Sequence, residues 1–145
     1  MNLKYKLLDS FAKAPVISGH DGDKRLTAGI NLFSRVKVRI NTHSYEMIPT
    51  GVGFEIPANY MGMLKARSGF AAKTGTIVNA GVIDSNYRGE IIVIINNPTD
   101  KIVDVAPGMG IAQMLLLPVP HISLEVTENL SITERGSQGF GSTGD

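Results

Sequence analysis

Short alternations of apolar and polar residues recur along this chain, and they constrain its fold more than any other feature of the sequence. Segments 36–40, 52–56 and 122–126 each carry an apolar residue at every second position. Successive side chains of a strand point to opposite faces, so each segment is predicted to be a half-buried strand. Apolar residues at helical spacing are nearly absent.

Two other segments are apolar almost throughout, IIVII at 91–95 and MLLLPV at 114–119. Strands of this kind are covered on both faces, by the core or by another subunit. Turn-forming residues cluster at 49–51, 96–98 and 106–108 between the apolar runs. We therefore predict an all-β chain, a jelly-roll-like β-barrel or sandwich.

One short helix is predicted at 68–74, because Ala71 and Ala72 favour helix. Ser68 is expected to cap its start and Gly75 to end it.

Length and charge restrict the classes of function. The chain has 145 residues, the size of one domain, and a net charge of +1. Such a balance gives no overall field for nucleic acid or an anionic membrane. No segment approaches the roughly 20 apolar residues of a membrane span, and cysteine is absent, as in many proteins of a reducing cytoplasm. We expect a cytoplasmic protein that binds neither membranes nor nucleic acid directly.

Two groups of polar residues in segment 67–90 are candidates for binding or catalysis. Arg67, Ser68 and Gly69 stand at the predicted helix start, where a guanidinium, a hydroxyl and free N–H groups suit a phosphate. A capping serine beside a surface arginine explains them equally well. Asp84 follows two apolar residues at a turn, where a carboxylate can be held as a general base. Taken alone, an aspartate that stabilises its own turn is the commoner case.

The tail from residue 134 onward is rich in Gly and Ser but contains Arg135 and Phe140. Chain ends of this composition are commonly unstructured. A spacer has no need of an aromatic ring, however. We therefore divide the chain into a body at 1–133 and a flexible C-terminal lid at 134–145.

Five motifs of the trimeric dUTP pyrophosphatases (dUTPases) resemble segments of this chain, in the same order. TAGINLFS at 27–34 resembles motif one, and segment 67–90 resembles motifs two and three. PGMGIAQMLLLP at 107–118 resembles motif four, and RGSQGFGSTG at 135–144 resembles motif five. The resemblance covers almost the whole chain, and motifs three and five are long and specific.

The resemblance implies a jelly-roll homotrimer with exchanged C-terminal arms and active sites shared by three chains. It implies Mg²⁺-assisted hydrolysis of dUTP to dUMP and pyrophosphate in a bacterial or phage-infected cell. That reaction limits uracil incorporation into DNA and supplies dUMP for dTMP synthesis.

Residue roles follow from the same resemblance. Asp84 matches the aspartate that activates water, and Tyr87 matches the tyrosine that packs under the deoxyribose and excludes a 2′-hydroxyl. Asn79 and the backbone near Gly81 match the hairpin that reads uracil. The phosphate contacts match Arg67, Ser68, Gly69, Gln113 and Arg135, and the ring that covers uracil matches Phe140.

Two positions depart from the family pattern. Asn31 stands where motif one usually has an aspartate near the water shell of the metal, so it keeps the shape without the charge. Met109 and Gly110 replace the Asp-Arg pair of motif four, so a family salt bridge is expected to be missing.

Two other functions are considered. A dCTP deaminase-like relative would carry a glutamate base where this chain has Ile94, which argues against deamination. A nucleotide-responsive regulatory protein of the same fold would bind dUTP without turning it over.

Overall fold

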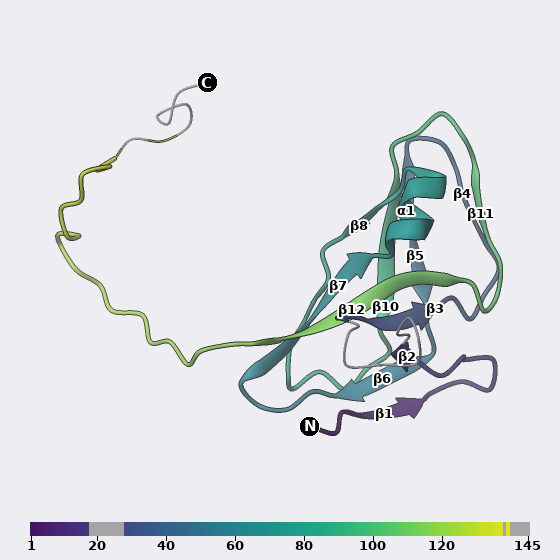
Figure 1. Cartoon of the computed structure of the whole chain (residues 1–145), viewed down its shortest axis with the longest axis horizontal. Coiled ribbons are helices and arrows are strands. Elements are labelled where there is room, and N and C mark those ends of the chain that lie inside the picture. Colours follow the sequence, from purple (N-terminus) through teal and green to yellow (C-terminus); the bar gives the residue numbers. More distant parts are fainter. Residues whose placement is uncertain (18–27, 138, 140–145) are drawn as a thin grey trace.

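The computed structural model describes residues 1–17, 28–137 and 139, and it confirms a mostly β chain with one short helix (Figure 1). The elements are β1 (Lys4–Leu7), β2 (Val16–Ile17), β3 (Ile30–Phe33), β4 (Val38–Ile40), β5 (Ser44–Pro49), β6 (Val52–Glu55), β7 (Tyr60–Ala66), α1 (Ser68–Thr74), β8 (Ile77–Asn79), β9 (Val82–Ile83), β10 (Ile92–Asn97), β11 (Val103–Val105) and β12 (Gly110–Pro118). Within this part of the chain, no helix is long and apolar enough to cross a membrane.

Antiparallel pairing joins the strands into four small sheets. The largest has the order β2-β3-β12-β7-β9, and a three-stranded sheet has the order β5-β10-β8. Two pairs, β1 with β6 and β4 with β11, complete the body. Many neighbours are distant in sequence, as in the predicted jelly roll.

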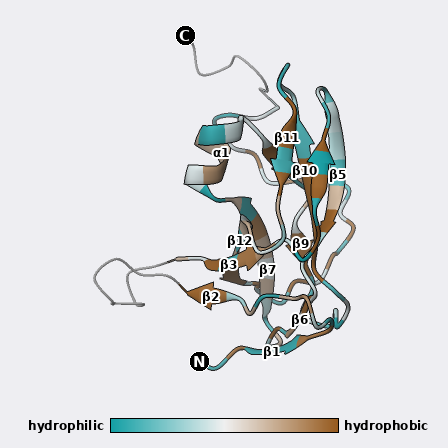
Figure 2. Ribbon diagram, turned by 90° about the vertical axis from the view of Figure 1, so that its right-hand side faces the viewer, coloured by the Kyte–Doolittle hydropathy of each residue, from teal (hydrophilic) through white to brown (hydrophobic). Residues whose placement is uncertain are grey.

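The core lies between the sheets and consists of one face of each long strand. Val93 and Ile95 of β10 are fully buried, as are Ile111 and Met114 of β12. Figure 2 shows hydrophobic stretches along the strands of the body. The buried side chains of the largest sheet and of the three-stranded sheet belong to one shared apolar core.

The outer face of the three-stranded sheet is apolar but not covered by the described residues. Tyr45, Met47 and Ile77 are 62%, 58% and 51% exposed. Ile94 of β10 lies beside Met47 in the register and is half-buried. Of the apolar run 91–95, the single chain therefore buries one face fully and leaves the other partly open.

Helix α1 confirms the predicted range but not its predicted cap. Arg67 is the N-cap, with extended φ and ψ of −77° and 131°, and no side chain caps the start. Ser68 is already helical, because the extended conformation of β7 continues through Arg67. Gly75 ends the helix as predicted, with a φ of 71° and its N–H bonded to Ala71 O at 2.7 Å.

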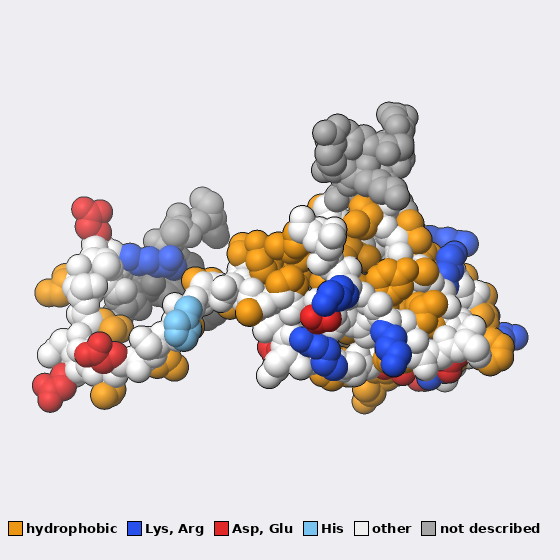
Figure 3. Space-filling model, turned by 90° about the horizontal axis from the view of Figure 1, so that it is seen from below, with side chains coloured by type: hydrophobic (Ala, Val, Ile, Leu, Met, Phe, Trp, Pro, Cys, Tyr) orange, Lys and Arg blue, Asp and Glu red, His pale blue; other side chains and the backbone are white. Residues whose placement is uncertain are grey.

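Residues 119–137 leave the body after β12 and form no strand. The prediction of a strand at 122–126 is wrong for the single chain, since Leu124 and Val126 are 96% and 97% exposed. A strand needs a neighbour for its backbone N–H and C=O groups, and none of the described strands pairs with this segment. Figure 3 shows the described residues of this segment standing clear of the body.

Candidate functional site

Strand β7 connects the two groups of candidate residues. It lies between β12 and β9 in the largest sheet and runs into α1 at its C-terminal end (Figure 1). Arg67 and Ser68 follow that end directly. Asp84 follows β9, which runs in the opposite direction along the first half of β7.

At the α1 end, two polar side chains are bonded to carbonyl groups of neighbouring strands. Arg67 Nη1 donates to Gly110 O at 3.1 Å, and Gln113 Nε2 donates to Ala66 O at 3.1 Å. Gly110 has no side chain in the way, since a Cβ there would lie 2.8 Å from Arg67 Cζ. Position 110, where the family usually has a residue of its Asp-Arg pair, is thus a glycine that leaves room for the Arg67 guanidinium.

The same end also holds the predicted metal residue Asn31 and the predicted phosphate residues Ser68 and Gly69. Asn31 of β3 and Lys65 of β7 are both register partners of Gln113, so the three side chains share one face of the sheet. Asn31 is 9% exposed, whereas Ser68 and Gly69 are exposed at the start of α1. Cations, amides and a hydroxyl at one edge suit a bound anion.

Asn79 and Gly81 lie where the chain crosses between the two larger sheets. Ala80 and Gly81 have positive φ values of 54° and 106°, which makes a tight corner. A Cβ at Gly81 would lie 3.0 Å from Leu64 O, and Leu64 N donates to Gly81 O at 2.8 Å. Only glycine fits this conformation and this close approach to β7.

This corner differs from the expected hairpin. Strand β8 pairs with β10, and β9 pairs with β7, so the strands on either side of the corner belong to different sheets. Local turn residues predict that the chain reverses. They do not fix the strand that each arm joins, because that choice depends on distant segments.

Asp84 lies at an exposed turn that the backbone closes. Tyr87 N donates to Asp84 O at 3.1 Å. The Asp84 carboxylate has no hydrogen bond or salt bridge to any described residue. An aspartate that stabilises its own turn would use its side chain, so this arrangement favours the alternative of a carboxylate open to a ligand or water.

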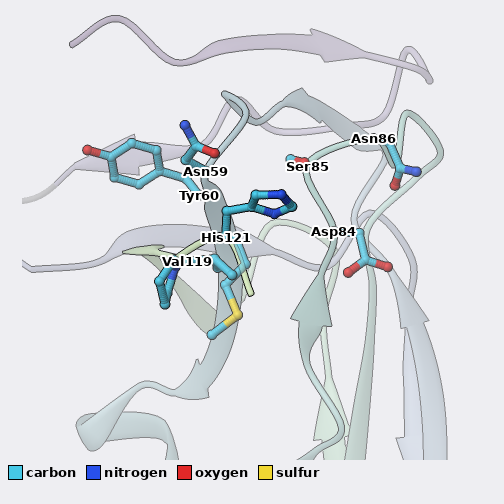
Figure 4. A pocket seen from close by; sticks show the side chains of 9 residues that line it. Asn59, Tyr60, Asp84, Ser85, Asn86, Val119 and His121 are labelled. Carbon is cyan, nitrogen blue, oxygen red and sulfur yellow. The ribbon is translucent and has the colours of Figure 1, made fainter. Parts of the chain in front are cut away.

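Two hollows flank Asp84. One, of about 210 Å³, is lined by Val82, Ile83, Asp84, Tyr87, Glu90 and Ile92. The other, of about 450 Å³, includes Tyr60, Asp84 and His121 among its lining residues. Figure 4 shows Asp84 and Asn86 on one side of the larger hollow and His121 opposite them. The carboxylate is therefore accessible from two sides.

Tyr87 is 43% exposed and is fixed at its hydroxyl, which donates to Glu90 O at 2.9 Å. Its ring lies against Gly89, where a Cβ would approach Cε2 to 3.0 Å. Our sequence analysis did not single out Glu90. No motif or spacing marks it, because its partners are distant in sequence.

A single chain does not bring Asp84 and Arg67 together. The register pairs Ile83 with Gly62, so Asp84 lies beside Met61. Arg67 stands six positions farther along an extended segment, a distance of about 20 Å at roughly 3.3 Å per residue. The corner at Gly81 lies between them, beside Leu64.

Of the two lid residues singled out in the sequence, the structure describes only Arg135. Arg135 is exposed on the tail, and Phe140 is outside the described residues. Within the described ranges, no three His, Cys, Asp or Glu residues are grouped to hold a metal ion.

Known proteins resemble this chain over almost its whole length. The dUTPase family model matches residues 21–144. Deoxyuridine 5′-triphosphate nucleotidohydrolase from Clostridium tetani is 43% identical over 144 residues, which are 98% of this chain and 96% of that protein. The enzyme of the same name from Picosynechococcus is 43% identical, with 86% and 87% covered.

Solved structures of dUTPases are also similar to this chain. The dUTPase of Staphylococcus bacteriophage 80alpha with dUpNHpp has a TM-score of 0.88 and 29% identity, with 99% of each chain covered. The structure of a mutant dUTPase from S. aureus phage phi11, at 24% identity and a TM-score of 0.80 with 91% of this chain and 100% of that chain covered, reveals the coordination of a structural Mg(II) ion in that protein.

Proposed function

Since this chain belongs to the dUTPase family, we propose that it hydrolyses dUTP to dUMP and pyrophosphate, with Asp84 activating the attacking water. The observation that carries the assignment of Asp84 is its exposed carboxylate, which has no partner among the described residues and stands on a turn closed by backbone bonds. Ile94 occupies the position of the deaminase glutamate, so dCTP deamination is not favoured.

The chemistry of the step is an in-line displacement at the α-phosphorus. Asp84 accepts a proton from the water while the water oxygen bonds to phosphorus. The bond from phosphorus to the α,β-bridging oxygen breaks, and pyrophosphate leaves. Positioning and charge stabilisation supply most of the rate in such transfers.

The corner at Ala80 and Gly81, together with Tyr87, recognises the nucleoside. Backbone groups around Ala80 and Gly81, with Asn79, present fixed donors and acceptors to the edge of uracil. A mismatched base leaves such groups unpaired, which is costly in a closed site. The Tyr87 ring packs under deoxyribose and leaves no room for a 2′-hydroxyl.

Arg67, Ser68, Gly69, Gln113 and Arg135 are the proposed phosphate contacts. Arg67 uses one guanidinium N–H on Gly110 O, and the guanidinium has five N–H donors. The remaining donors can bind phosphate while that bond holds the side chain in place.

The donor set fits a magnesium ion bound chiefly through the nucleotide. Mg²⁺ commonly takes one or two protein ligands, with waters and phosphate oxygens filling the rest. Asn31, which shares a sheet face with Gln113, is the residue that would contact its water shell. When bound, the ion neutralises triphosphate charge.

A homotrimer with shared sites explains the separation along β7. The apolar outer face of β5-β10-β8 suits packing against a second copy of the chain, since large exposed apolar surfaces mark interfaces. The extended residues 119–137 suit exchange onto a neighbouring subunit, where 122–126 would gain the strand partner it lacks. Residues 134–145, with Phe140, would then close over a bound nucleotide as a lid.

A pyrophosphate-release assay tests the function directly. The protein is incubated with dUTP, dTTP, dCTP and UTP, each with and without Mg²⁺. We expect turnover of dUTP, strongly enhanced by Mg²⁺, and little turnover of the other three. Tight binding of dUTP without pyrophosphate release would overturn the proposal in favour of a regulatory protein.

A further inference from the structure

Glu90 borders the hollow that contains Asp84 and Tyr87, but the proposed chemistry gives it no role. Its carboxylate Oε1 accepts a hydrogen bond from Arg35 Nε at 2.9 Å and another from the backbone N–H of Gly51 at 2.6 Å. Both charged side chains are only about one quarter exposed, at 26% and 25%. The pair is therefore shielded from solvent more than an ordinary surface salt bridge.

Arg35 joins three distant parts of the chain. Its Nη1 lies 3.3 Å from Asp9 Oδ2 of the segment after β1, while Nε bonds to Glu90. The side-chain hydrogen bond that Arg35 donates to Glu90 raises the pKa of the Arg35 guanidinium. Backbone bonds then fix the next residue, since Ile91 N donates to Val52 O at 2.8 Å.

The backbone of Glu90 in turn holds Tyr87. The carbonyl oxygen of Glu90 accepts the Tyr87 hydroxyl at 2.9 Å, and Gly89 leaves room for the ring. The backbone dihedral angles of a residue set the direction of its carbonyl group. At Glu90 these angles are restrained by the hydrogen bonds of its own side chain and by the backbone hydrogen bond of Ile91.

We propose that Glu90 is a positioning residue for sugar selectivity, acting through its carbonyl on Tyr87 and held in place by Arg35. The inference rests on the proposed function, in which the Tyr87 ring rejects a 2′-hydroxyl. Loss of the ion pair between Arg35 and Glu90 lets the Glu90 carbonyl and the Tyr87 ring shift, so the protein distinguishes dUTP from UTP less well.

The readout is the ratio of kcat/KM for dUTP to kcat/KM for UTP. Partial unfolding of a variant lowers both values equally and leaves their ratio unchanged. We expect the ratio to fall about three- to tenfold in Glu90→Ala and in Arg35→Ala, the range that one hydrogen bond is worth. Glu90→Gln keeps the size and one acceptor and should fall between wild type and Glu90→Ala.

Arg39→Ala is the matched control. Arg39 also forms an ion pair, with Nε 2.8 Å from Asp104 Oδ1, but it lies on the β4–β11 pair and touches neither Glu90 nor Tyr87. Its ratio should equal that of the wild type.

A double-mutant cycle shows whether the effect passes through the Tyr87 hydroxyl. Tyr87→Phe removes the group that Glu90 O holds, so adding Glu90→Ala to it should lower the ratio no further. An unchanged ratio in Glu90→Ala, or additive losses in the double variant, would overturn the inference. If the wild type does not hydrolyse dUTP, both the proposed function and this inference are wrong. If it does, the dUTP-to-UTP ratios of the variants test the inference separately from the function.

Discussion

The two ends of β7 are built differently. At the α1 end, Arg67 and Gln113 are already bonded to carbonyls of neighbouring strands, and Gly110 shapes the space. At the other end, backbone bonds close the turn and the Asp84 carboxylate has no partner among the described residues. The phosphate end is thus organised through side chains, whereas the Asp84 end is organised through the backbone. Changes at Asp84 should affect chemistry alone, and changes at the phosphate end should affect binding.

Asp84→Asn should have the largest effect of any single substitution. The amide keeps the shape but cannot accept the water proton, so we expect kcat to fall about 10²- to 10⁴-fold. The melting temperature should stay at the wild-type value, because no described bond of the folded chain uses the carboxylate. Steady-state kinetics and thermal unfolding test both expectations. Parental turnover in this variant would remove Asp84 from the mechanism.

A chain ending at Glu134 should come next. It lacks Arg135 and Phe140, the residues proposed to contact the phosphates and cover uracil at the joined site. We expect kcat/KM to fall about 100-fold, as for loss of one preorganised donor to the transition state. Residues 119–137 are exposed in the single chain, so the melting temperature should hardly change. Full turnover by the shortened chain would refute the lid.

Gly110→Ala tests the phosphate end. The added methyl would meet the guanidinium of Arg67, the flexible end of a side chain, so Arg67 should move while the strands stay in place. We expect KM for dUTP to rise about tenfold, as for loss of a charge-assisted bond, with kcat changing less. A change confined to kcat, or an unchanged KM and kcat, would show that the Arg67 contact with Gly110 O does not prepare the phosphate site.

The sequence predicts the elements made by local patterns. The helix at 68–74 is found at those residues, and the alternation at 36–40 and 52–56 becomes β4 and β6. The turn at Asp84 is also predicted, because short-range turn residues determine it.

The features that the sequence does not predict have a different cause. They depend on segments that are distant in the sequence or on a partner for the strand pattern. Segment 122–126 has the strand pattern but pairs with no other strand in the part of the chain that the structure describes. The corner at Gly81 sends β8 and β9 to different sheets. Glu90 meets Arg35, which is 55 positions away, so no local pattern reveals the pair.

Asn31→Asp should have the smallest effect and sharpens the account of the phosphate end. Asn31 is 9% exposed and shares a sheet face with Gln113, where a carboxylate would add charge near the proposed metal water shell. Residues that contact a metal through water commonly change its affinity about tenfold or more, and a partly buried charge offsets part of that gain. We therefore expect the Mg²⁺ concentration for half-maximal activity to fall about two- to fivefold.

Asn41→Asp is the control for that substitution, since it makes the same charge change at an exposed loop beyond β4. Its Mg²⁺ dependence should match the wild type. Equal titration curves for Asn31→Asp and Asn41→Asp would show that the charge at position 31 does not reach the ion. Asn31 would then serve the β3–β12 pairing alone, and the phosphate end would hold its metal entirely through the nucleotide.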